Sequence, residues 1–114
     1  MTDASPDLGA LRASLLVRLE ALRAASETTA DNRRPVELDQ TSVGRLSRMD
    51  AMQVQAMALA ADRRRQDETR RVEAAISRID EGEYGFCISC GEEIPAKRLG
   101  VDPIIATCIS CASG

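Results

Sequence analysis

The stretch that decides the fold lies near the C-terminal end, where residues 84–111 are YGFCISCGEEIPAKRLGVDPIIATCISC. It holds all four cysteines of the 114-residue chain, as the pairs Cys87/Cys90 and Cys108/Cys111. Two Cys-x-x-Cys pairs separated by about 15–20 residues are typical of a four-cysteine zinc site. Four thiolates fill the tetrahedron that Zn²⁺ prefers and leave no open position. The sequence therefore predicts one structural zinc ion held by these four residues.

Three other uses of the cysteines stay open at this stage. Disulfides are disfavoured in a reducing cytosol, and a redox pair is typically found near a βαβ pattern that we do not find here. An iron–sulfur cluster also uses four cysteines. The N-terminus has no basic region followed by an apolar block, and no apolar run approaches the ~20 residues of a membrane span. We therefore expect a cytoplasmic protein with reduced cysteines.

Composition argues against two further classes of function. The formal net charge is −3, whereas domains that hold bare nucleic acid are usually basic, so no sequence-specific DNA binding is expected. Tyr84 and Phe86 are the only aromatic residues, which leaves little for base stacking. The chain contains no histidine and no phosphate-cradling glycine loop, and with a closed metal site this predicts a protein that is not an enzyme.

The residues before the cysteines predict two long helices. Leucines recur every three or four residues at positions 8, 11, 15, 19 and 22, which predicts a helix over residues 6–29 with Ser5 as its cap. A polar segment containing a proline predicts a loop over residues 30–41. A second helix is expected over residues 42–81, with Gly82 as its stop.

The predicted fold is mostly α: an antiparallel two-helix coiled-coil hairpin over residues 1–82 and a small C-terminal four-cysteine zinc finger over residues 83–114. Residues 62–71, DRRRQDETRR, predict a solvated helix surface. Residues 51–61, AMQVQAMALAA, are apolar on most faces, and we expect them to pack on the first helix. The alternative is a surface for a partner or a second copy, since methionine surfaces adapt to partners. The side chains expected to pack around the zinc site are Tyr84, Phe86, Ile94, Leu99 and Ile104.

The stretch ISRIDEGEYGFCISCGEEIPAKRLGVDPIIATCISCA, from Ile76 to Ala112, also carries a recognisable pattern. It has I-x-x-G-x-Y/F-G-x-C-x-x-C-G-x-x-I-x-x-x-R-L, then a proline and a second C-x-x-C. This pattern resembles the C-terminal region of DksA/TraR-type zinc-finger proteins. The matching positions are Ile79, Gly82, Tyr84, Gly85, Cys87, Cys90, Gly91, Ile94, Arg98, Leu99, Pro103, Cys108 and Cys111.

The resemblance implies a bacterial transcription regulator that binds RNA polymerase and inserts its coiled-coil tip in the secondary channel. The D-x-x-D-x-A tip motif of the best-known members is absent. Asp39, Asp50 and Ala51 are the tip residues we expect in its place. We expect a monomer. The alternative function is a zinc-stabilised helical adaptor or self-association module that does not bind polymerase.

Overall fold

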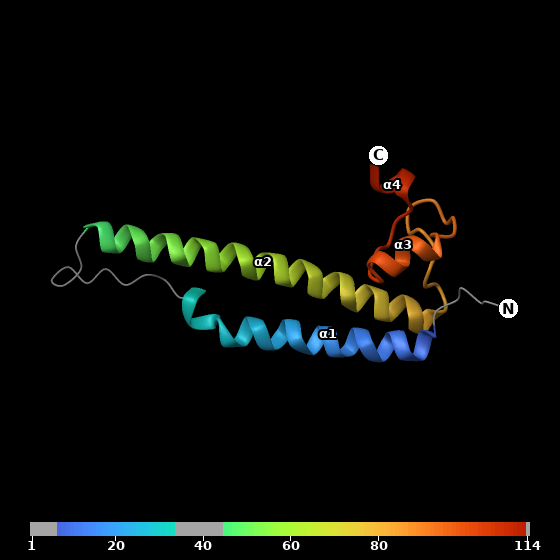
Figure 1. The fold of residues 1–114 in the computed structure, drawn as a ribbon, viewed down its shortest axis with the longest axis horizontal. Coiled ribbons are helices and arrows are strands. Elements are labelled where there is room, and N and C mark those ends of the chain that lie inside the picture. The colour runs from blue at the N-terminus through green and yellow to red at the C-terminus, as the bar shows by residue number, and fades with distance from the viewer. Residues whose placement is uncertain (1–6, 34–44, 114) are drawn as a thin grey trace.

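The computed structural model describes residues 7–33 and 45–113. Two long helices lie side by side in opposite directions, and the cysteine-rich region folds against the end where the second helix finishes (Figure 1). Among the described residues there is no β-strand, so the predicted mostly helical fold is confirmed. The elements are α1 (Leu8–Thr28), the 3-10 helix η1 (Ala30–Arg33), α2 (Arg45–Glu81), α3 (Ala96–Val101) and α4 (Ile109–Ser113).

Helix α1 begins at Leu8 because Asp7 caps it. One carboxylate oxygen of Asp7 accepts hydrogen bonds from the backbone N–H groups of Gly9, at 3.0 Å, and Ala10, at 3.2 Å. These groups have no partner inside the helix, and an acceptor at the N-cap typically contributes about 1 kcal/mol. The prediction of Ser5 as the cap was wrong. Aspartate caps a helix as well as serine does, and the helix begins after Asp7.

The apolar core joins three parts of the chain. Leu15 and Leu19 of α1 pack with Val72 and Ile76 of α2, and Ile104 of the cysteine-rich region enters the same cluster. All five side chains are buried. Full burial of such a side chain is worth about 1.5–3 kcal/mol. The cysteine-rich region is therefore packed into the hairpin core rather than tethered to it.

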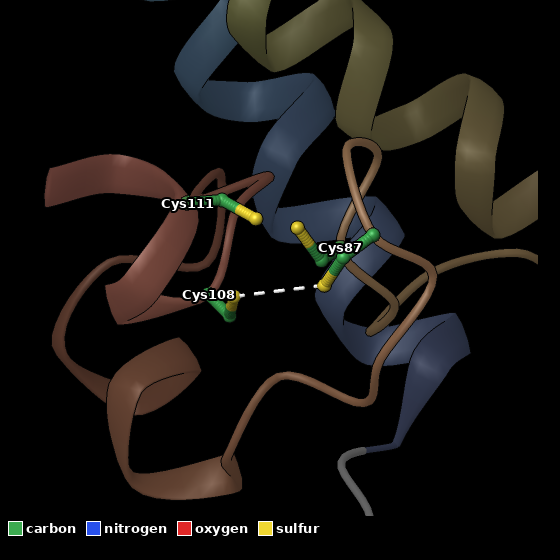
Figure 2. Close-up of side chains that lie close together, drawn as sticks. Cys87, Cys108 and Cys111 are labelled. Carbon is green, nitrogen blue, oxygen red and sulfur yellow. Dashed lines mark hydrogen bonds between the residues drawn. The ribbon is translucent and has the colours of Figure 1, made fainter. Parts of the chain in front are cut away.

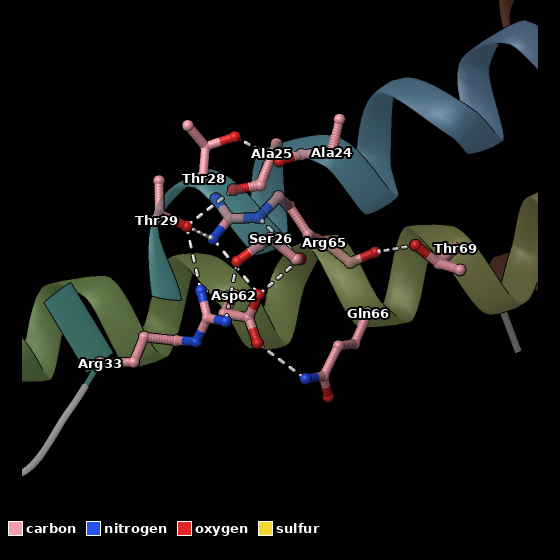
Figure 3. Close-up of polar contacts among 10 residues, drawn as sticks. All are labelled: Ala24, Ala25, Ser26, Thr28, Thr29, Arg33, Asp62, Arg65, Gln66 and Thr69. Atoms are coloured by element: carbon pink, nitrogen blue, oxygen red, sulfur yellow. Dashed lines mark hydrogen bonds and ion pairs between the residues drawn. The ribbon is translucent and has the colours of Figure 1, made fainter. Parts of the chain in front are cut away.

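Farther from the cysteines, the contact between the helices becomes polar. The α2 side chains that face α1 recur every three or four residues, and they change from apolar at Val72 and Ile76 to charged at Asp62 and Arg65. Asp62 is only 6% exposed and has several donors around it (Figure 3). They are Ser26 Oγ at 2.7 Å, Gln66 Nε2 at 2.7 Å, Arg65 Nη2 at 3.3 Å and Arg33 Nη1 at 3.4 Å.

The same network holds η1 against the end of α1. Arg33 donates to the Ser26 carbonyl at 2.9 Å and to Thr29 Oγ1 at 3.0 Å, while its ion pair reaches Asp62 on α2. A buried carboxylate is tolerated because its charge is paired and its oxygens accept hydrogen bonds. The charge pattern predicted that residues 62–71 form a solvated surface. The structure shows that this is only partly correct. One face of this segment forms the contact with α1.

The expectation that residues 51–61 pack on α1 was wrong. Met52, Val54 and Met57 are 54%, 57% and 65% exposed. Helix α1 and η1 contact α2 through a neighbouring face, on which Arg33 O lies 3.5 Å from Gln55 Nε2. Met52, Val54 and Met57 therefore face solvent.

Helix α2 ends at the predicted glycine. Gly82 has φ of 76°, a conformation that residues with a β-carbon adopt at a cost. The next N–H, that of Glu83, bonds to the Arg78 carbonyl at 2.8 Å and closes the helix end. In the part of the chain that the structure describes, no helix is both long and apolar enough to cross a membrane.

Candidate metal centre

The first cysteine pair lies on a tight turn shaped by backbone hydrogen bonds. Cys87 N–H bonds to the Glu92 carbonyl at 2.8 Å, and Gly91 N–H bonds back to the Cys87 carbonyl at 2.9 Å. Gly91 has φ of 79°, as expected for the glycine that follows the second cysteine. The turn brings Cys87 and Cys90 to one side of a short loop.

The second pair lies at the start of α4. Ala112 N–H bonds to the Cys108 carbonyl at 2.9 Å, so the helical turn places Cys108 and Cys111 on the same face. Ile88 N–H bonds to the Ala106 carbonyl at 2.9 Å and joins the two turns. Local hydrogen bonds within each turn, and one backbone hydrogen bond between the turns, therefore bring the two cysteine pairs together.

All four cysteine sulfurs lie within 4.8 Å of one another. The sulfurs of Cys87, Cys108 and Cys111 point toward a common centre (Figure 2). The Sγ atoms of Cys90 and Cys108 are 3.7 Å apart, too far for a disulfide and close to the ~3.8 Å edge of a tetrahedron with Zn–S bonds of ~2.3 Å. The cluster therefore fits a four-coordinate zinc ion.

Electrostatics in the cluster also favours a cation. Backbone N–H groups, that of Cys108 foremost, lower the pKa of the Cys87 thiol to about 6. Neighbouring sulfurs, that of Cys108 foremost, raise the pKa of Cys111 to about 12. The first thiolate forms readily, and further thiolates are opposed by the charge beside them. A divalent cation at the centre removes that repulsion, because it stabilises every coordinating thiolate.

The apolar packing around the cluster agrees with the prediction except at Phe86. Ile94 and Ile104 are buried, Leu99 is half-buried, and half-buried Tyr84 donates its hydroxyl to the Pro103 carbonyl at 2.9 Å. Phe86 is 46% exposed and lies opposite Glu93 in an isolated antiparallel bridge. Phe86 therefore packs only in part, because nearly half of the residue stays exposed to solvent.

Arg18 of α1 connects the hairpin to the cysteine-rich region. Its guanidinium donates to Glu68 of α2 at 2.9 Å and to Asp102 at 3.3 Å. The Asp102 carboxylate also accepts from the backbone N–H of Ile104 at 3.2 Å, beside the point where Ile104 enters the core. Sequence reasoning did not find this bridge, because its members lie 50 and 84 residues apart in the chain. No local pattern marks such a pair.

Two of the three expected tip residues lie far from the cysteines. Asp50 and Ala51 are exposed in the first turns of α2, at the end of the helix opposite Gly82. Asp39 falls outside the described residues. Asp50 and Ala51 therefore lie outside the metal centre.

The fold and the site together define a class: a helical hairpin with a four-cysteine zinc finger at its base. Residues 82–114 match the family described as the prokaryotic dksA/traR C4-type zinc finger. Over these residues the chain therefore carries a zinc finger of the DksA/TraR type. The donor set and the family together identify the cofactor as zinc, as predicted.

Sequence relatives match over little more than a third of this chain. The chain is 38% identical over 42 residues to the RNA polymerase-binding transcription factor DksA of Haemophilus influenzae, and 34% identical over 42 residues to the protein of the same name in Escherichia coli K12. An uncharacterised protein of Aquifex aeolicus is 44% identical over 43 residues. These matches cover 37–38% of this chain and only 28–30% of the relatives. The named relatives are transcription factors, which agrees with the prediction that the chain is not an enzyme.

Solved structures extend the likeness to the hairpin. Transcription factor DksA2 from Pseudomonas aeruginosa superposes with a TM-score of 0.70 at 23% identity, over 93% of this chain and 80% of that one. The DnaK suppressor protein from Agrobacterium tumefaciens C58 superposes with a TM-score of 0.56 at 27% identity, over 96% and 94% of the two chains. The predicted combination of hairpin and finger is confirmed.

Proposed function

We propose that this protein is a bacterial transcription regulator that binds RNA polymerase directly. Its hairpin tip enters the secondary channel and modulates initiation. The observation that carries the proposal is a dksA/traR-type finger at the base of a hairpin whose fold matches DksA2. The relatives from Haemophilus influenzae and Escherichia coli K12 are named as RNA polymerase-binding transcription factors.

The dimensions of α2 suit this role. Its 37 residues extend ~55 Å, and the helix continues past η1 on the side away from the finger (Figure 1). A slender projection of this length reaches into a channel that a compact domain cannot enter. The net charge of −3 favours protein as the partner rather than promoter DNA, and the role requires a cytoplasmic location.

The proposal gives separate tasks to the two ends of the molecule. Cys87, Cys90, Cys108 and Cys111 are the zinc ligands, and the ion fixes the base of the hairpin without taking part in a reaction. Asp39, Asp50 and Ala51 act at the tip. Asp50 and Ala51 are exposed on α2, so no packing contact has to break before they meet a partner.

Direct binding to polymerase tests the proposal. The zinc-loaded chain, mixed with core RNA polymerase and no DNA, is expected to co-purify at micromolar concentrations. Repeating the measurement with promoter DNA present separates a contact to polymerase from a contact to DNA. A chain that stays unbound without DNA, yet folds and holds zinc, removes the proposed function.

A further inference from the structure

The 3-10 helix η1 lies against α2 although its sequence, Ala-Asp-Asn-Arg, offers no large apolar side chain to bury. A 3-10 helix also has poorer hydrogen-bond geometry than an α-helix, so η1 contributes little stability of its own. Arg33, the last residue of η1, makes a polar contact in place of apolar burial. Its side chain is only 20% exposed and pairs with buried Asp62. The position of η1 therefore depends on Arg33.

The guanidinium of Arg33 joins η1 to both long helices at once (Figure 3). It donates to the Ser26 carbonyl at 2.9 Å and to Thr29 Oγ1 at 3.0 Å, and it lies 3.4 Å from Asp62 of α2. A planar fork of five N–H donors suits acceptors spread in this way, whereas a lysine ammonium acts as a point charge. The backbone carbonyl of Arg33 also lies 3.5 Å from Gln55 Nε2. Arg33 therefore fixes η1 on α2 and braces α2 near Gln55.

Arg65 of α2 joins the two long helices separately. It donates to Ser26 Oγ at 3.3 Å and to Thr29 Oγ1 at 3.0 Å, and it pairs with Asp62 at 3.3 Å. The Ser26 hydroxyl also donates directly to Asp62 at 2.7 Å. None of these four contacts passes through Arg33. Loss of the Arg33 side chain therefore leaves Asp62 paired and leaves α1 joined to α2.

We propose that Arg33 is a latch, which holds η1 closed on α2 and releases it as a local unit without separating α1 from α2. A unit with few buried apolar contacts opens at a lower free energy than the whole fold. In the closed state α2 is braced at Gln55, which lies five residues and ~7.5 Å along the helix from Asp50. In the open state the part of α2 that η1 does not support becomes longer. The latch therefore sets the stiffness of the end of α2 that carries Asp50.

Hydrogen exchange on the zinc-loaded chain, without polymerase, tests the latch. Arg33→Met keeps most of the side-chain length and removes the guanidinium. It is expected to speed exchange by about tenfold or more over residues 29–33, because hydrogen bonds from a charged donor are lost. Exchange over residues 50–55 should also rise, since α2 loses its brace. The core amides of Leu19 and Val72 should keep their rates.

Two further variants separate the fork of Arg33 from its charge and from ion pairs in general. Arg33→Lys keeps the charge without the fork and should speed exchange over residues 29–33 to an intermediate degree. Arg23→Met is the matched control, because exposed Arg23 on α1 pairs with Glu73 on α2 at 2.8 Å. It should leave exchange over residues 29–33 unchanged. Circular dichroism checks that each variant keeps its helices, and Arg33→Lys decides the question if Arg33→Met does not fold.

Acceleration confined to residues 29–33 and 50–55 supports the latch. Unchanged exchange over residues 29–33 in the Arg33 variants overturns it. Equal acceleration at Leu19 and Val72 also overturns it, because η1 then opens only with the whole fold. The same acceleration in Arg23→Met contradicts the specific role of Arg33. All of these outcomes are measured without polymerase, so a failure of the proposed function leaves the latch standing, and the reverse also holds.

Discussion

Asp62 is the residue whose structural role differs most from its appearance in the sequence. It begins a run of ten mostly charged residues, which predicts a solvated face, yet it is the buried acceptor for Ser26, Gln66 and two arginines. The Ser26 hydroxyl foremost, with Arg33 and Arg65, lowers the pKa of this carboxyl. The run of charged residues did not predict that Asp62 is buried, because the partners of Asp62 on α1 and η1 are about thirty residues away in the chain.

Asp62→Asn is expected to destabilise the hairpin by about 1–3 kcal/mol at pH 7, since buried donors lose a charged acceptor. A carboxyl whose folded pKa is lowered stabilises the fold above its unfolded pKa, and this contribution is lost as the pH falls through the folded value. The difference between wild type and variant should therefore shrink below about pH 4. Urea unfolding of both proteins as a function of pH measures this difference in the free energy of unfolding.

Asp67→Asn is the control for that experiment, because Asp67 lies on the same helix with its side chain 56% exposed. The Asp67→Asn substitution should change the free energy of unfolding by no more than about 0.5 kcal/mol. Equal effects of the two substitutions would contradict the role given to Asp62.

The cysteines carry a second prediction at the residue scale. The Cys111 thiol, with a pKa of about 12, holds its proton at neutral pH in the metal-free chain, whereas a zinc-bound thiolate has none. Zinc binding therefore releases protons, and zinc affinity should rise at least tenfold per pH unit between about pH 6 and pH 8. Competition with a chelator dye measures this, and a pH-independent affinity would count against thiolate ligation.

At the scale of elements, the two helices and the finger differ in how well their sequences predict them. The leucine spacing predicts α1, and the paired cysteines predict the finger, because each is a local pattern with few structural solutions. The orientation of residues 51–61 was mispredicted, since alanine, methionine and valine on most faces give no usable period. The face toward α1 is set by the polar network around Asp62, whose members lie on α1, η1 and α2.

The junction between finger and hairpin depends on Ile104. Its side chain is 2% exposed in the core that α1 and α2 form. Ile104→Ala is expected to cost about 2–5 kcal/mol, from lost burial and the cavity that remains. The zinc content should not change, because the cysteines keep their local turns.

Thermal unfolding measures the loss of stability in Ile104→Ala, and a zinc assay measures whether its zinc content is unchanged. Val101→Ala provides the comparison, since Val101 is 83% exposed and should have almost no effect. Loss of zinc in the Ile104 variant would mean that the finger depends on the hairpin for its own folding.

For the whole molecule, the shared core couples metal binding to the stability of the hairpin. Ile104 enters the core from the finger, and Arg18 bridges α1 to Glu68 and Asp102. Metal binding supplies folding free energy to regions of this kind. Removing zinc should therefore release Ile104 and lower the melting temperature of the helices.

Circular dichroism with and without chelator measures this coupling. Most of the helical signal should persist at low temperature, because α1 and α2 hold most of the helical residues. An unchanged melting temperature would show that the hairpin and the finger are energetically independent.

We propose that the zinc finger stabilises the fold, while the remote end of the hairpin regulates transcription. The double variant Asp39→Asn/Asp50→Asn removes the two carboxylates that we propose act at the tip, and it leaves the cysteines and the core unchanged. Transcription in a purified system, with wild type and double variant added in competition, measures the claim directly. The account predicts that the double variant binds polymerase, fails to regulate and blocks the wild type. Full regulation by the double variant, or its complete loss of binding, would contradict the account.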